Sequence, residues 1–138
     1  VFGCIAAQAH AGTQRQWLAA LACGNTVLVA LPEAAREQAA GVLAYWREAG
    51  LPAGALQLLE GPFDVAAAAV ADDARVAGLL CEPAAAGALR RRVAARPGAI
   101  VPVIAGDPAA ALWRLAAEQT LTINTAAAGG NAALLAGA

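Results

Sequence analysis

The chain contains three cysteines and one histidine, the residue types from which a thiol nucleophile or a metal site would be built. No two cysteines have C-x-x-C spacing, and their odd number argues against a disulfide framework. Cys4 falls within an apolar strand pattern and Cys23 at a helix end, so we expect both to be buried structural thiols. Cys81 ends a predicted strand at the sheet edge where ligands usually bind, so a reactive thiol stays open there.

The other ionisable residues do not form a recognisable catalytic set. His10 follows the first predicted strand, and we interpret it as a solvated loop residue rather than an acid or base. The chain has no serine, so a Ser-His-Asp triad is excluded. Asp72 and Asp73 are paired carboxylates, and their position before a strand is typical of residues that end a helix. We therefore expect no catalytic residue and no metal ligand in this chain.

A nucleotide site would also need a phosphate-binding loop. The fingerprint G-x-G-x-x-G is absent from residues 7–12, which contain one glycine, and the chain has no lysine for a P-loop. Glu33 could accept a ribose hydroxyl, although its place in the first turn of a helix favours a solvated role. Backbone donors near Gly12 and Thr13, with His10 and Glu33 beside them, leave a degenerate nucleotide or small-ligand site as an alternative.

Short apolar runs alternate with segments of helical period, which is the pattern of a parallel sheet covered by helices. The predicted strands are residues 1–6, 26–30, 55–59, 76–81, 100–104 and 121–124. Three predicted helices span residues 33–49, 64–71 and 84–95. Two more are predicted from their N-caps, one capped by Thr13 and one capped by Asp107. The pattern predicts a doubly wound, mostly parallel, Rossmann-like α/β sheet. Pro102 lacks an N–H donor, so its strand should lie toward one side of the sheet.

The helical period also predicts which side chains face the core. These inward-facing residues are Trp17, Leu18 and Leu21 in the helix capped by Thr13, Ala39, Val42, Leu43 and Trp46 in the second helix, and Leu112 and Leu115 in the helix that Asp107 caps.

Composition limits the chain to one small domain. It has 138 residues, 14% charged residues and a net charge of −1, and its arginine cluster at 90–96 is too short for a nucleic-acid surface. It has neither 18 consecutive apolar residues nor a signal segment, so we expect a cytoplasmic protein without a membrane span. The absence of methionine predicts a piece of a longer protein.

The last residues differ from the rest. We divide the chain into an α/β domain at 1–119 and a C-terminal strand and docking motif at 120–138, where an alternating strand pattern leads into a run of alanine, glycine and leucine. An uncharged segment of small residues with a few large apolar ones is suited to docking on another surface. The predicted contact residues are Leu121, Ile123, Asn124, Thr125, Gly129, Gly130, Asn131, Leu134 and Leu135.

Residues 20–34, ALACGNTVLVALPEA, resemble the aldehyde dehydrogenase superfamily, in which a helix ends in A-L-x-x-G-N-T-V and the next strand leads to K-P-S-E. The matching residues are Leu21, Gly24, Asn25, Thr26, Val27 and Glu33. A further match to the family's E-A-G-L-P-x-G-V-L-x-x-x-x-G is carried by Glu48, Ala49, Gly50, Leu51, Pro52, Gly54, Leu56 and Gly61. The resemblance implies the cofactor-domain fold of this family.

The chain departs from the family pattern where the family contacts its cofactor. The family's cofactor-contacting lysine falls on Ala30, its F-T-G-S turn near residues 81–84, and its catalytic E-L-G-G near residues 104–107. The oxyanion-hole asparagine has no counterpart, because the loop after Ile5 is shorter, and the domain with the nucleophilic cysteine is absent. The resemblance thus implies the architecture without the cofactor contacts.

Residues 122–135, TINTAAAGGNAALL, resemble the C-terminal motif of the proline utilization A enzymes, which join an FAD-dependent proline dehydrogenase to an NAD-dependent glutamate semialdehyde dehydrogenase. Longer members carry an extra domain ending in this motif, and the chain is similar to that domain. The resemblance implies a non-catalytic domain, without a cofactor of its own, that packs on the aldehyde dehydrogenase domain of the same or a neighbouring chain. It also implies support of that active site and of substrate channelling, and a part in homo-oligomer geometry.

Three hypotheses follow. The first is this structural and assembly domain, with 121–135 as the contact element. The second is the degenerate nucleotide or small-ligand site near Gly12, and the third is an independent oxidoreductase fragment that uses Cys81.

Overall fold

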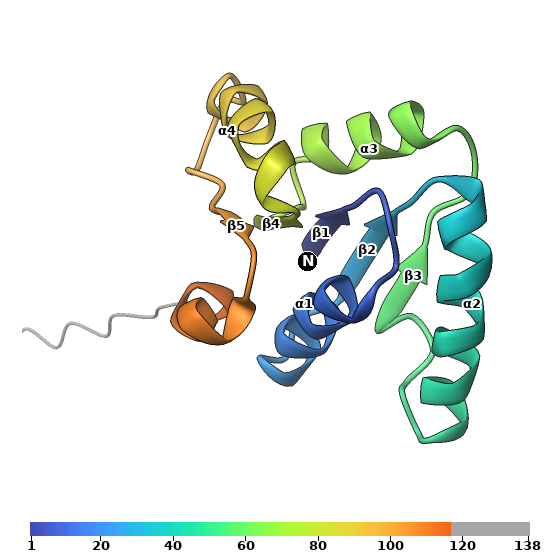
Figure 1. Cartoon of the computed structure of the whole chain (residues 1–138). Helices are drawn as coiled ribbons and strands as arrows, with labels where there is room; N and C mark the ends of the chain where they lie inside the picture. Colours follow the sequence, from blue (N-terminus) through green and yellow to red (C-terminus); the bar gives the residue numbers. More distant parts are fainter. Residues whose placement is uncertain (117–138) are drawn as a thin grey trace, which may run out of the picture.

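Residues 1–116 are described by the computed structural model, in which a five-stranded parallel sheet lies between two layers of helices (Figure 1). The strands are β1 (Phe2–Ile5), β2 (Val27–Ala30), β3 (Leu56–Leu58), β4 (Gly78–Cys81) and β5 (Val103–Ala105). Their order in the sheet is β3-β2-β1-β4-β5, and every neighbouring pair is parallel. The predicted doubly wound α/β fold is therefore confirmed.

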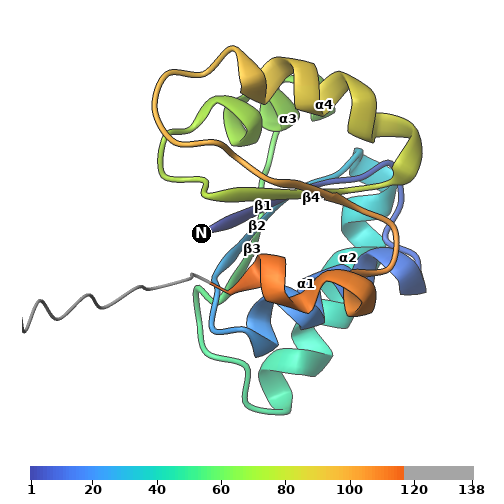
Figure 2. The same cartoon turned by 90° about the vertical axis from the view of Figure 1, so that its left-hand side faces the viewer.

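The helices are divided between the two faces of the sheet. They are α1 (Ala11–Ala22), α2 (Glu33–Glu48), α3 (Phe63–Asp72) and α4 (Ala86–Ala94), with short 3₁₀ helices η1 (Pro83–Ala85) and η2 (Pro108–Leu115). Figure 2 shows α3 and α4 on one face, with α1, α2 and the orange η2 on the other. No helix within residues 1–116 is long and apolar enough to cross a membrane.

Each face of the sheet has its own core. Because alternate strand residues point to opposite faces, Cys4 packs with the α1, α2 and η2 side, and Ile5 packs with the α3 and α4 side. On the first side Trp17 is fully buried and meets Trp46 edge to face, with 6.2 Å between ring centroids. This contact places α1 against α2 and so sets the orientation of the residues next to Trp17.

The observed elements follow the predicted ones with ends that differ by a few residues. Among residues 1–116, β5 lies at one side of the sheet, as the position of Pro102 predicted. Two predicted inward-facing residues are wrong, since Leu18 is 48% exposed on α1 and Leu112 is 46% exposed on η2. Helical periodicity predicts the direction of the buried face of a helix but not its width. On α1 and η2 the buried face is narrower than predicted. The predicted strand at 121–124 lies outside the described residues.

Arginines in and just after α4 contact the C-terminal end of α3 and the loop that follows it. Arg96 donates to the carbonyl oxygens of Ala71 at 3.2 Å, Asp73 at 2.9 Å and Val76 at 3.3 Å, and Arg92 forms an ion pair with Asp72 at 2.6 Å. Asp72 and Asp73 do end α3, as predicted. A side-chain hydrogen bond from Arg75 lowers the pKa of Asp73 to about 2. Both carboxylates are thus paired with arginines at the end of α3.

Gly78→Ala should destabilise the domain, because a Cβ at this position in β4 would meet the ring of Phe2 on the adjacent strand. Overpacking of this kind costs about 1–3 kcal/mol in the free energy of unfolding. The matched control is Gly41→Ala on the exposed side of α2, where a Cβ meets nothing within 4 Å. It should stabilise by up to about 1 kcal/mol, since alanine is the better helix former. Urea denaturation measures both, and a neutral Gly78→Ala would contradict this packing.

Candidate functional site

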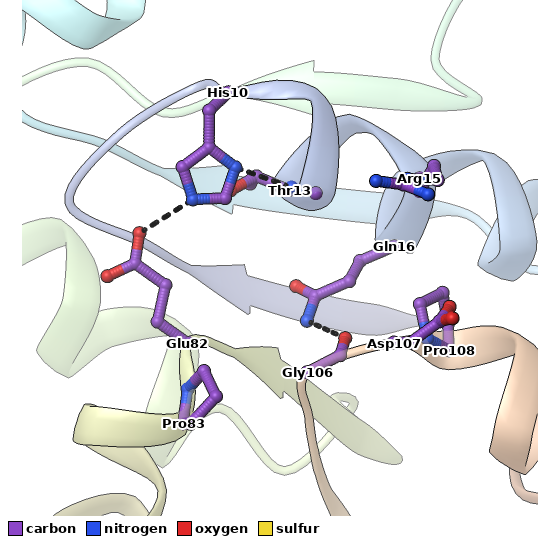
Figure 3. Close-up of a pocket in the computed structure, with 10 residues that line it drawn as sticks. His10, Thr13, Arg15, Gln16, Glu82, Pro83, Gly106, Asp107 and Pro108 are labelled. Carbon is purple, nitrogen blue, oxygen red and sulfur yellow. Dashed lines mark hydrogen bonds and ion pairs between the residues drawn. The ribbon is translucent and has the colours of Figure 1, made fainter.

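The candidate site lies at the carboxyl ends of β1, β4 and β5. The chain builds β2 and β3 on one side of β1 and then crosses to β4 on the other side, so β1 and β4 flank the topological switch point. Ligands of doubly wound sheets usually bind in the crevice at this point. Here the crevice holds a cavity of about 190 Å³, lined by the first turns of α1 and by the residues that follow β4 and β5 (Figure 3).

His10 closes one side of this cavity. Its Nδ1 accepts a hydrogen bond from the backbone N–H of Thr13 at 3.1 Å and so caps α1. Its Nε2 lies 3.7 Å from Oε1 of Glu82 (Figure 3), so we assign the ring proton to Nε2. The predicted cap Thr13 is therefore wrong, and His10 is more than a solvated loop residue. An imidazole is an uncommon cap, so residue-type preferences point to threonine instead.

Gln16 joins α1 to the two strand ends. Its side chain is 4% exposed, and Nε2 donates to the carbonyl oxygens of Cys81 at 3.0 Å and Gly106 at 2.8 Å. The sequence analysis does not identify this residue. The only signal is a glutamine directly before the buried Trp17, and its partners are 65 and 90 positions away along the chain.

The cysteines are placed as packing residues at the core and its border. Cys4 and Cys81 are 0% exposed, and burial raises the pKa of Cys4 to about 12 and also raises that of Cys81. Cys23 is only half-buried at the C-terminal cap of α1, so its predicted burial is partly wrong. A raised pKa and a covered sulfur both oppose thiolate chemistry at Cys81. No cluster of three metal-ligating side chains occurs among the described residues.

Glu33 is not part of this cavity. It lies in the first turn of α2 and lines a separate depression with Arg36, Glu37 and Glu60, beside the ends of β2 and β3. Arg36 is committed to the carbonyl oxygens of Leu59 and Gly61 at 3.1 and 3.0 Å. The structure therefore does not bring Glu33 into the cavity with His10 and Gly12, which the nucleotide-site alternative required.

The residues at the crevice do not fit the phosphates of a dinucleotide. A pyrophosphate binds free N–H groups at the start of the first helix. Here the imidazole of His10 already takes the N–H of Thr13, and the carboxylate of Glu82 stands beside it. A negative charge at this distance would repel a phosphate. Ala30, on which the family's cofactor-contacting lysine falls, is fully buried.

The predicted contact residues of the docking motif all lie outside the described residues. They are Leu121, Ile123, Asn124, Thr125, Gly129, Gly130, Asn131, Leu134 and Leu135.

His10→Ala should lower the free energy of unfolding by about 0.5–2 kcal/mol, because it removes the cap of α1. His10→Asn should keep most of the stability, since a short amide oxygen is a good acceptor at a helix start. Urea denaturation at neutral pH distinguishes the two variants. Equal losses in both would mean that the ring contributes by packing and that the cap is not what stabilises α1.

Comparison with known proteins agrees with the fold. The model of the aldehyde dehydrogenase family matches residues 10–81, which is more than half of the chain. Similar solved structures include a mutant of Bradyrhizobium japonicum proline utilization A (PutA), a PutA with proline bound in remote sites, and a bifunctional PutA. Each is 31% identical with a TM-score of 0.66, over 77% of this chain.

The match covers only 11% of each of those longer chains. No curated protein matches the chain. The family match runs from the cap of α1 through β4, so it includes β2, β3, β4 and the α1 side of the crevice, whereas the lining residues after β4 and β5 lie beyond it. The chain belongs to the aldehyde dehydrogenase family.

Proposed function

We propose that the chain is a non-catalytic domain of a proline utilization A protein, and that it packs on the catalytic aldehyde dehydrogenase domain and supports its active site. One observation carries the proposal. The crevice in which this fold binds ligands contains the chain's own Gln16, His10 and Glu82, each engaged with a neighbouring element. Side chains of the domain itself thus occupy the crevice in which this fold binds a dinucleotide, and we infer that the domain serves a structural role instead.

The relatives support the kind of parent protein. The similar structures are of PutA, one of them described as bifunctional. By the resemblance of residues 122–135 to a C-terminal motif, the chain is the C-terminal domain of such a protein. FAD and NAD then serve the proline dehydrogenase and the glutamate semialdehyde dehydrogenase of the parent, and neither is bound by this domain.

The contact element in this proposal is the segment 120–138, which follows the α/β domain of 1–119. Its partner is the aldehyde dehydrogenase domain of the same or a neighbouring chain, where it covers the path of the enclosed intermediate and contributes to the homo-oligomer. η2 ends at Leu115 and carries the 77% exposed Trp113, a few positions before this segment in the sequence. An exposed large apolar side chain at this end of the domain supports a role in docking.

A small-ligand site is the second candidate, and the cavity of about 190 Å³ favours it. Its nucleotide form is opposed by the carboxylate of Glu82 beside the capped helix start.

Deletion of 121–138 from the parent enzyme tests the first proposal. We expect the glutamate semialdehyde dehydrogenase activity and the coupled conversion of proline to glutamate to fall strongly, because the neighbouring active site loses its cover. Proline oxidation should persist.

A double variant, Leu134→Asp with Leu135→Asp, should act like the deletion by making docking unfavourable. The control is Tyr45→Asp, which introduces one negative charge at a 70% exposed side chain on α2, and it should leave all activities unchanged. Unchanged dehydrogenase activity and coupling in the deletion would overturn the supporting role.

A further inference from the structure

The amide of Gln16 has only one orientation that satisfies its neighbours. Its nitrogen lies between two main-chain carbonyl oxygens, of Cys81 and Gly106, and both must receive an N–H. The carbonyl end Oε1 is therefore turned the other way, toward the Glu82 side of the cavity (Figure 3). Within residues 1–116 no donor reaches this oxygen. Gln16 is 96% buried as a residue, and its Oε1 is not among the fully buried side-chain atoms that lack a partner, so within residues 1–116 this acceptor is open to the cavity.

Glu82 adds negative charge at the same end. Its Oε1 faces Nε2 of His10, and no hydrogen bond to Oε2 occurs among the described residues. The carboxylate is only partly exposed, with 29% of its side chain open to solvent. An amide oxygen and a carboxylate together favour a positively charged group with several N–H donors, and a primary or secondary ammonium is the smallest such group.

The opposite charge lies at the rim. Arg15 precedes Gln16 on α1, lines the same cavity and is exposed, and within the described residues it has neither an ion pair nor a hydrogen bond. Asp107 also lines the cavity, but its Oδ1 accepts the backbone N–H of Ala109 as the cap of η2. The guanidinium is free to pair with a carboxylate of a ligand.

We infer that this cavity binds a small zwitterion of the free α-amino acid class. The ammonium group meets Gln16 Oε1 and the carboxylate of Glu82, and the ligand carboxylate meets Arg15. Pro83 and Pro108 supply apolar walls for a short side chain. The size agrees, since a cavity of about 150 Å³ holds a benzene molecule and this one measures about 190 Å³. The inference concerns a site of the domain itself and does not rest on the proposed docking role.

Calorimetric titration of the 138-residue chain with L-alanine tests the inference. The comparison probes are acetate, which has only the carboxylate of the amino acid, and methylammonium, which has only the ammonium group. We expect saturable binding of L-alanine in the millimolar range and clearly weaker binding of either half. Glu82→Gln and Arg15→Gln should each weaken L-alanine binding by about tenfold or more, because each removes one charged hydrogen bond.

The matched control is Arg47→Gln, which removes another exposed arginine from the last turn of α2, away from the cavity. It should bind L-alanine as the unmodified chain does. Circular dichroism establishes that each variant is folded. No saturable heat with L-alanine would overturn the inference, and so would equal binding of methylammonium or equal loss in Arg47→Gln.

Discussion

Two main-chain carbonyl groups, of Cys81 and Gly106, end inside the crevice of this sheet, and the amide of Gln16 pairs both of them. A buried carbonyl without a donor costs free energy, so this amide is what allows β4, β5 and α1 to meet closely. Its position depends in turn on Trp17, the next residue of α1, which is fully buried and packs on Trp46 of α2. Core packing and crevice chemistry are thus set by consecutive residues of one helix.

The chemistry of the crevice follows from which groups that helix brings there. The start of α1 carries a partial positive charge that favours an anion. His10 takes the hydrogen-bonding role of such an anion, and Glu82 supplies the negative charge nearby. The chain therefore shares the aldehyde dehydrogenase fold, while a carboxylate of its own stands beside the start of α1. The fold therefore does not determine the chemistry of the site, because that chemistry depends on a few side chains at the crevice that can differ without changing the fold.

Much of the fold was predictable because its signals are local. Short apolar strands, the periodic stripe of α2, and the Asp107 cap each depend on neighbouring residues, and the lack of an N–H at Pro102 placed its strand at the edge. The site was not predictable in the same way. Gln16 and Arg96 act through carbonyl groups distant along the chain, and no local pattern reveals such partners. His10 was missed as the cap because residue-type preferences favoured Thr13, with its hydroxyl oxygen as the acceptor. In the structure, the backbone N–H of Thr13 is instead the donor, and His10 Nδ1 accepts it.

We propose that the crevice does not accept a dinucleotide, because the imidazole of His10 takes the N–H of Thr13 at the start of α1 and the carboxylate of Glu82 stands beside it. Calorimetric titration of the chain with NAD measures this directly. The structure predicts no saturable heat up to millimolar NAD. Saturable binding of NAD in the micromolar range would contradict the claim, because it would require phosphates to displace the His10 cap and lie next to Glu82.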